Sequence, residues 1–175
     1  MSNNYNKKTA VNLRQLLKLA HKDSNLEMTE SESVALPFGD GPLRFNRKHY
    51  KTIKNEMFYN CSKLKEIKLG KNVESIQYDA FAYSGIESIV IPKNVTTLGY
   101  GELKDCSQGM FDGCKKLKLV EFRSKKIDDV YKTTFLNTPK DAVFRVPQGK
   151  LEEYTKLFRE GGLAEDIVIE ESTEW

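Results

Sequence analysis

Three cysteines and two histidines could support nucleophilic catalysis or metal binding: Cys61, Cys106, Cys114, His21 and His49. A cysteine nucleophile needs a base beside it, usually a histidine, and neither histidine lies at a repeat distance from a cysteine. The cysteines also lack the C-x-x-C or H-x-x-x-H spacing that closes a zinc site, and no glycine-rich phosphate loop is present. The sequence therefore predicts no catalytic residue, no metal site and no cofactor.

Two of the cysteines occupy a position that recurs along the chain. The third residue after each of four phenylalanines is small and weakly polar: Cys61, Ser84, Cys114 and Thr138. Such a residue suits a tight buried turn in which its S–H or O–H group bonds a backbone carbonyl. We expect Cys61 and Cys114 to be structural, and a cysteine-dependent enzyme that uses Cys106 remains an alternative that Cys106→Ala would test.

The phenylalanines belong to a repeat. An apolar residue is followed eight positions later by phenylalanine at Tyr50–Phe58, Val73–Phe81 and Ile127–Phe135, while eight extra residues separate Val95 from Phe111. A unit of this length cannot bury its own apolar face and must stack on its neighbours, so the repeat predicts a solenoid. The extra residues, within 99–110, are expected to form a loop on one face.

Each unit contains a short segment of period two, such as Ile67-Lys68-Leu69, which predicts a strand with one face buried. Stacked copies form a parallel sheet. The expected inward residues are Leu43, Phe45, Tyr50 and Ile53; Phe58, Leu64, Ile67, Leu69, Val73 and Ile76; Phe81, Ile86, Ile89, Ile91, Val95 and Leu98; Phe111, Leu117, Val120, Phe122, Ile127 and Val130; and Phe135, Phe144 and Val146.

The residues between the inward positions form columns on the outer face. The central column is Arg44, Lys68, Val90, Glu121 and Arg145; the flanking columns are Glu66, Ser88, Leu119 and Val143, and Asn46, Gly70, Pro92, Arg123 and Pro147. Apolar residues beside charged ones are typical of an interaction site, although strand-forming residues on a half-exposed sheet would look the same. The candidate binding residues are Arg44, Lys68, Val90, Leu119, Glu121, Arg123, Val143 and Arg145.

Charge and hydropathy exclude several classes of function. The chain of 175 residues has 28 basic and 25 acidic residues, a balance that does not predict nucleic-acid binding. No segment has the roughly 18 consecutive apolar residues of a membrane span. Arg14 and Lys18 interrupt the apolar run near the start, so no signal peptide is expected in this chain. As written, the sequence is that of a cytoplasmic protein.

The two ends differ from the repeats. Leu13, Leu16, Leu17 and Ala20 predict an amphipathic helix over residues 9–22, which we interpret as a cap on the first repeat, followed by a linker at 25–33. The expected organisation is an N-terminal helical cap and linker at 1–40, a repeat solenoid at 41–147 and a C-terminal cap at 148–175. The fold class is thus an α/β solenoid with short parallel strands.

The segments MFYNCSKLKEIKLGKNVESIQ and AFAYSGIESIVIPKNVTTLG resemble the repeat of the BspA-like leucine-rich repeat family, AFxxCxxLxxIxIPxxVxxIG. The segments VPQGKLEEYTKLF and DIVIEES resemble the helix and last strand with which that family closes its solenoid. The resemblance implies bacterial surface or secreted proteins that mediate adhesion and protein binding.

We therefore expect a non-enzymatic module that binds a protein or peptide through its strand face. A self-assembling structural protein is the alternative, and the sequence does not determine the oligomeric state.

Overall fold

The computed structural model describes residues 43–45, 51–100 and 108–173, all within one compact unit, Gly39–Trp175. The expected helix at 9–22, the linker, both histidines and Cys106 lie outside the described residues. So does most of the inserted segment.

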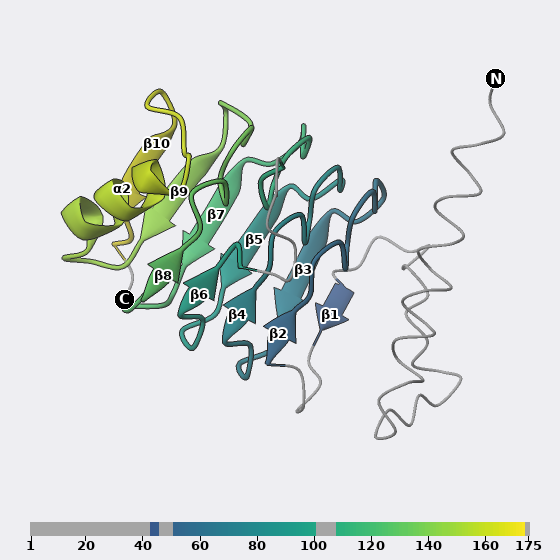
Figure 1. The fold of residues 1–175 in the computed structure, drawn as a ribbon, viewed down its shortest axis with the longest axis horizontal. Helices are drawn as coiled ribbons and strands as arrows, with labels where there is room; N and C mark the ends of the chain where they lie inside the picture. Colours follow the sequence, from purple (N-terminus) through teal and green to yellow (C-terminus); the bar gives the residue numbers. More distant parts are fainter. Residues whose placement is uncertain (1–42, 46–50, 101–107, 174–175) are drawn as a thin grey trace, which may run out of the picture. The chain divides into compact units, whose positions relative to one another are not determined.

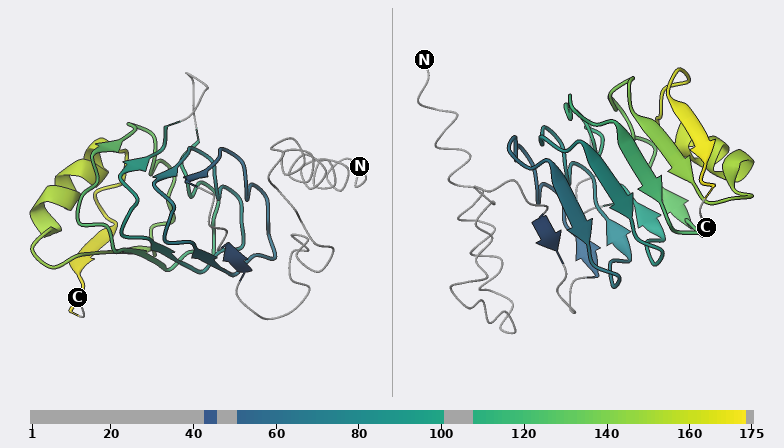
Figure 2. Two further views of the ribbon diagram at one scale, coloured as in Figure 1. Left: turned by 90° about the horizontal axis from the view of Figure 1, so that it is seen from below. Right: turned by 180° about the vertical axis from the view of Figure 1, so that it is seen from behind.

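Two parallel sheets form opposite walls of a coil (Figures 1 and 2). The long-strand sheet has the order β1-β3-β5-β7-β9-β10, and the short-strand sheet has the order β2-β4-β6-β8. The long-strand sheet contains β1 (Leu43–Phe45), β3 (Glu66–Leu69), β5 (Ser88–Ile91), β7 (Leu119–Phe122), β9 (Val143–Val146) and β10 (Val168–Glu171). The short-strand sheet contains β2 (Thr52–Ile53), β4 (Ser75–Ile76), β6 (Thr97–Leu98) and β8 (Asp129–Val130). The predicted α/β repeat solenoid is confirmed.

The short-strand sheet was not predicted as a sheet. Its strands are two residues long, and each pairs in parallel with the next, as Ile53 does with Ile76 and Ile76 with Leu98. Two residues are too few to show a period of two, so the sequence revealed only the inward apolar residue of each strand.

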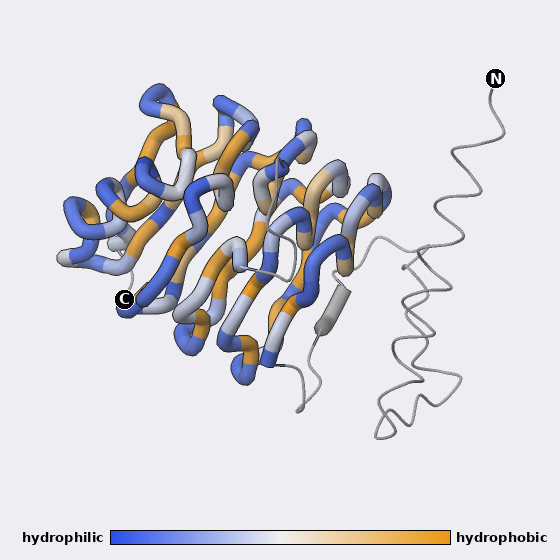
Figure 3. The backbone as a smooth tube through the Cα atoms, in the orientation of Figure 1, coloured by the Kyte–Doolittle hydropathy of each residue, from blue (hydrophilic) through white to orange (hydrophobic). Residues whose placement is uncertain are grey.

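Buried aromatic rings stack between the two sheets. Figure 3 shows hydrophobic residues along the strands and hydrophilic residues at the turns. The rings of Phe58 and Phe81 stack with centroids 5.3 Å apart, and those of Phe81 and Phe111 with centroids 5.9 Å apart. Most of the predicted inward residues are buried; the exceptions with described side chains, Leu69 and Val130, are half-buried near the ends of their sheets, where fewer strands cover them.

The small residues after the phenylalanines are buried as predicted. The Cys114 thiol donates a hydrogen bond of 2.9 Å to the Phe81 carbonyl, and the Thr138 hydroxyl donates one of 2.8 Å to the Phe135 carbonyl. Ser84 lies 3.4 Å from the Cys114 sulfur. Cys114 and Ser84 therefore join neighbouring turns, and Thr138 closes its own turn, as a structural role requires.

The turns share a left-handed residue two positions after the phenylalanine. Asn60, Gly113 and Asn137 have φ values of 57°, 67° and 56°, which asparagine and glycine adopt readily. Tyr83 has a φ of 57° at the same position, and its ring lies where a side chain on Gly113 would be. Glycine at 113 therefore makes room for the Tyr83 ring.

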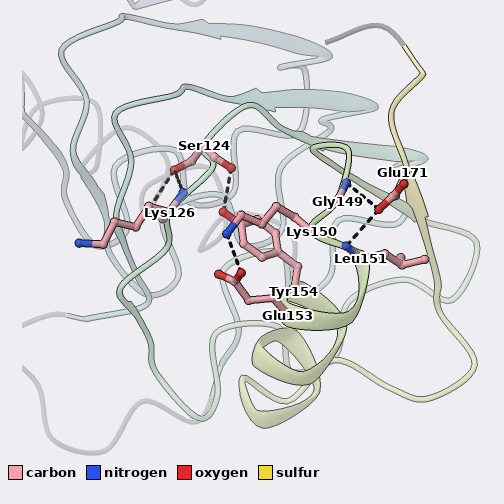
Figure 4. A network of polar contacts seen from close by, with 8 residues as sticks. All are labelled: Ser124, Lys126, Gly149, Lys150, Leu151, Glu153, Tyr154 and Glu171. Carbon is pink, nitrogen blue, oxygen red and sulfur yellow. Dashed lines mark hydrogen bonds and ion pairs between the residues drawn. The ribbon is translucent and has the colours of Figure 1, made fainter.

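A helix and a strand follow the last repeat, as the sequence predicted. α2 (Leu151–Glu160) buries Tyr154 and Phe158, and β10 pairs with β9. The Tyr154 hydroxyl donates a hydrogen bond of 2.8 Å to the Ser124 carbonyl (Figure 4).

Glu171 of β10 supplies the cap that α2 lacks from its own N-cap residue. Its carboxylate accepts hydrogen bonds from the backbone N–H groups of Gly149, at 2.9 Å, and Leu151, at 3.4 Å (Figure 4). The first N–H groups of a helix have no partner within it and favour a negative charge. The helix and the last strand therefore stabilise each other.

Candidate protein-binding surface

The outer face of the long-strand sheet carries the predicted columns in register. In the central column, Arg44 pairs with Lys68, Val90 with Glu121, and Glu121 with Arg145. Between β3 and β5, the register is given by the pairing of Glu66 with Ser88, two residues before Lys68 and Val90. In the flanking column Ser88 pairs with Leu119 and Leu119 with Val143. The structure therefore brings the predicted residues of the two columns together on one face.

The apolar members of this face are only partly exposed. Val90, Leu119 and Val143 are half-buried, whereas Lys68 and Arg123 are exposed. Side chains from neighbouring strands lie about 4.8 Å apart and shield one another. The face thus has half-buried apolar residues beside exposed charged ones.

Both arginines on the described face form ion pairs within the chain. Arg145 donates two hydrogen bonds to one oxygen of Glu170, at 3.0 and 2.7 Å, and Arg123 donates one of 2.9 Å to Glu121. The Lys68 Nζ atom lies 4.0 Å from Oε1 of Glu66. The Arg145–Glu170 pair is partly exposed, and exposed ion pairs contribute about 0–1 kcal/mol each, so a partner carboxylate can compete for this guanidinium group at low cost. The Glu121 side chain that pairs with Arg123 is only 14% exposed.

Two residues of the face were missed by the sequence analysis. Val168 pairs with Val143 and is 53% exposed, and Glu170 pairs with Arg145. They extend the flanking and central columns to a sixth strand. The signal was present, because Val168-Ile169-Glu170 repeats the outward, inward, outward pattern of Val143-Phe144-Arg145.

Three of the flanking-column residues do not contribute side chains to the surface. Gly70, Pro92 and Pro147 are buried at the ends of their strands, and Asn46 lies outside the described residues. Of that column, only Arg123 is an exposed described residue. The side chain of Arg44 also lies outside the description.

The described cysteines are poorly suited to nucleophilic chemistry. Cys61 and Cys114 are buried, and burial raises the pKa of both thiols, to about 11 for Cys61. The reactive form of cysteine is the thiolate, so these thiols are unreactive at neutral pH.

Within residues 43–45, 51–100 and 108–173, no cluster of histidine, cysteine and acidic side chains could hold a metal ion. In the same residues, no helix is long and apolar enough to cross a membrane.

One buried carboxyl group has a strongly shifted pKa. Asp79 is 8% exposed, and its Oδ1 atom has no hydrogen-bond partner among the described residues. Burial raises the pKa of Asp79 to about 6, with smaller contributions from the negative charges of Glu56 and Asp112. The ionised form of Asp79 is therefore unfavourable in the folded chain.

Asp79→Asn is expected to raise the free energy of unfolding by about 1–3 kcal/mol at pH 8, because one pKa unit corresponds to about 1.4 kcal/mol. The folded pKa is raised above the unfolded value, so the wild type loses stability as the pH rises from about 4 through about 6. Asparagine also accepts the φ of 52° at this position. Urea unfolding between pH 4 and 8 measures the effect, with the exposed Asp141→Asn as control; a gain independent of pH contradicts it.

Comparison with known proteins identifies the repeat. The family described as BspA type leucine rich repeat region, with six copies, matches residues 43–108 and 102–174. Repeat proteins of this kind are often involved in protein binding or adhesion, are often at the cell surface or secreted, and are generally not enzymes. Searches of curated proteins and of solved structures gave no match. Because the matched segments span most of its length, the chain belongs to the BspA type leucine rich repeat family.

Proposed function

We propose that this chain is a binding module that recognises a protein or peptide through the outer face of its long-strand sheet. The observation that carries the proposal is the row Leu119, Val143 and Val168, which crosses three adjacent strands beside a column of paired charges. Exposed apolar surface rimmed by charge is a mark of an interaction site. Adhesion is the role that the family suggests for such binding.

The size of the face favours a peptide or a small patch of a folded partner. Six strands at about 4.8 Å cover about 24 Å from first to last, less than a standard interface between two globular proteins requires. The apolar residues at the centre would supply most of the binding energy. The guanidinium groups of Arg123 and Arg145 would orient an acidic residue of the partner by exchanging their present carboxylates for its own.

The test is affinity capture with wild-type protein and with Val90→Glu/Leu119→Glu, from native lysate and from extracellular-matrix proteins. The matched control is Thr52→Glu/Thr97→Glu, which adds the same charge to half-buried strand residues of the short-strand sheet. All three proteins should have melting temperatures within a few degrees, so that unfolding does not explain a loss.

We expect a protein that is retained by the wild type and the control and lost with the Val90→Glu/Leu119→Glu variant. Its purified form should then bind the wild type at least tenfold more tightly than that variant. Equal capture by all three proteins, or capture by none, removes the outer face as the site. If the wild type also grows in size with concentration, the self-assembling alternative replaces the proposal.

A further inference from the structure

The far edge of β10 is open within the described part of the chain. β10 is the last strand of the long-strand sheet and pairs only with β9 there (Figure 2). Ser172 donates its N–H group to the Val146 carbonyl on the β9 side. Because peptide groups alternate sides along a strand, those of Ile169 and Glu171 point to the open edge. With respect to the described residues, this edge offers unpaired backbone donors and acceptors in the geometry of a strand.

Exposed apolar side chains lie beside this edge. Val168 of β10 is 53% exposed and Leu151 of α2 is 38% exposed. Leu151 also lines a shallow hollow whose other walls are Gly149, Glu152, Thr155, Lys156 and Glu171. Because Glu171 follows the inward residue Ile169 by two positions, the hollow lies on the inner side of the strand end.

The charges of the central column alternate towards the edge. Glu121, Arg145 and Glu170 lie on successive strands, and Arg145 bonds Glu170 at 2.7 Å. Glu170 is the last member, with Arg145 on one side and the open edge on the other. A cation at the next strand position would continue the alternation.

A second copy of this chain fits the edge poorly. Two β10 strands related by a two-fold axis run antiparallel, which places Glu170 and Glu171 of both copies in one short ribbon. Like charges opposite or diagonal to each other on paired strands are destabilising. The edge therefore favours a partner strand of opposite charge.

We propose that the β10 edge binds an extended, basic segment of another protein as a seventh parallel strand, with an apolar residue beside Val168 and a lysine or arginine beside Glu170. Main-chain hydrogen bonds supply affinity in this mode of binding, and alternate side chains supply specificity. The inward residue of the segment continues the column of Phe144 and Ile169, and the residue beside Glu171 reaches the hollow at Leu151. This site lies at the β10 end of the outer face and shares Val168 and Glu170 with it, whereas Val90 and Leu119 lie on β5 and β7, away from the edge.

The probe is a fluorescein-labelled peptide, GTVIRLTG, whose Val, Ile, Arg and Leu align with residues 168–171. We expect saturable binding to the full chain by fluorescence anisotropy. A peptide with Glu in place of Arg should bind about 10–100-fold more weakly, because a charge-assisted hydrogen bond is lost and a repulsion gained. The variant Glu170→Lys should reverse this preference.

Backbone pairing is tested on the peptide, so that folding of the protein is not in question. In the parallel register, the N–H group of the peptide's Arg faces β10 and that of its Ile faces away. N-methylation at Arg should abolish binding, and N-methylation at Ile should change it less than threefold. Hydrogen exchange at the amides of Ile169 and Glu171 should slow on binding.

The part of the outer face on β5 and β7 provides the comparison. Val90→Glu/Leu119→Glu should bind the probe with the affinity of the wild type, so loss of the outer-face function and loss of this site are distinguishable. No binding at millimolar peptide, equal binding of the Arg and Glu peptides, or equal effects of the two N-methyl groups overturns the proposal. Dimerisation that protects Ile169 and Glu171 without peptide also overturns it, because the occupant is then a second copy.

Discussion

Phe122→Ala is expected to lower the free energy of unfolding by about 3–5 kcal/mol, the largest loss among single substitutions in the core. Phe122 of β7 is 1% exposed, and its ring centroid lies 6.0 Å from that of Phe144 and 4.7 Å from that of Phe158. The rings of Phe135 and Tyr154 meet it edge-on at 6.4 and 6.3 Å. Removing this ring leaves a cavity where the last repeats meet α2.

Urea unfolding at neutral pH measures the loss. Tyr83→Ala is the matched control, because Tyr83 is an aromatic residue that is 39% exposed and whose ring packs on Tyr59 and over Gly113 rather than among the buried rings. Its loss should be much smaller than that of Phe122→Ala. A loss below about 1 kcal/mol for Phe122→Ala would mean that α2 and the last repeats close over the cavity, and that this cluster does not hold the C-terminal end together.

The repeat made most of the core predictable, because each unit repeats the same register. Phe58, Phe81, Phe111 and Phe135 are all buried, and the strand columns from Lys68 to Arg145 align as the spacing indicated. In a periodic sequence each contact recurs in several units, so one wrongly assigned residue does not change the predicted register.

The pairing of charges was less accessible from the sequence. The sequence identified Arg145 as a candidate binding residue but did not indicate that its guanidinium group bonds Glu170, which lies 25 positions further along the chain. Glu170 falls after α2, where the repeat spacing is interrupted. Only the parallel pairing of β9 with β10 places the two side chains together.

The spacing of residues in the sequence did not reveal features that depend on how separate repeats pack against each other. The open edge of β10 follows from sheet order, and the shifted pKa of Asp79 follows from burial beside Glu56 and Asp112. Neither has a sequence motif. Both arise because residues of different repeats become neighbours only in the folded solenoid.

Gly85→Ala is expected to lower the free energy of unfolding by about 3 kcal/mol, at the upper end of the cost of overfilling a packed site. A Cβ atom on Gly85 would overlap the carbonyl oxygen of Ser62 in the preceding turn. That obstacle is backbone and cannot rotate away. Gly85 also donates its N–H group to the Cys61 carbonyl at 3.0 Å, so relief of the overlap would stretch a hydrogen bond between neighbouring repeats.

Gly149→Ala separates this steric effect from backbone conformation. Gly149 has a φ of 74°, and no described atom lies within 4 Å of the Cβ position, so alanine there meets only the left-handed penalty of about 1–2 kcal/mol. Gly85 has the reverse situation, an ordinary φ and no space. Urea unfolding of both variants should therefore rank Gly85→Ala as the more damaging. Equal losses of unfolding free energy, or a larger loss for Gly149→Ala, would show that the turns can separate enough to admit a methyl group. The close spacing of the repeats would then not be the reason for glycine at position 85.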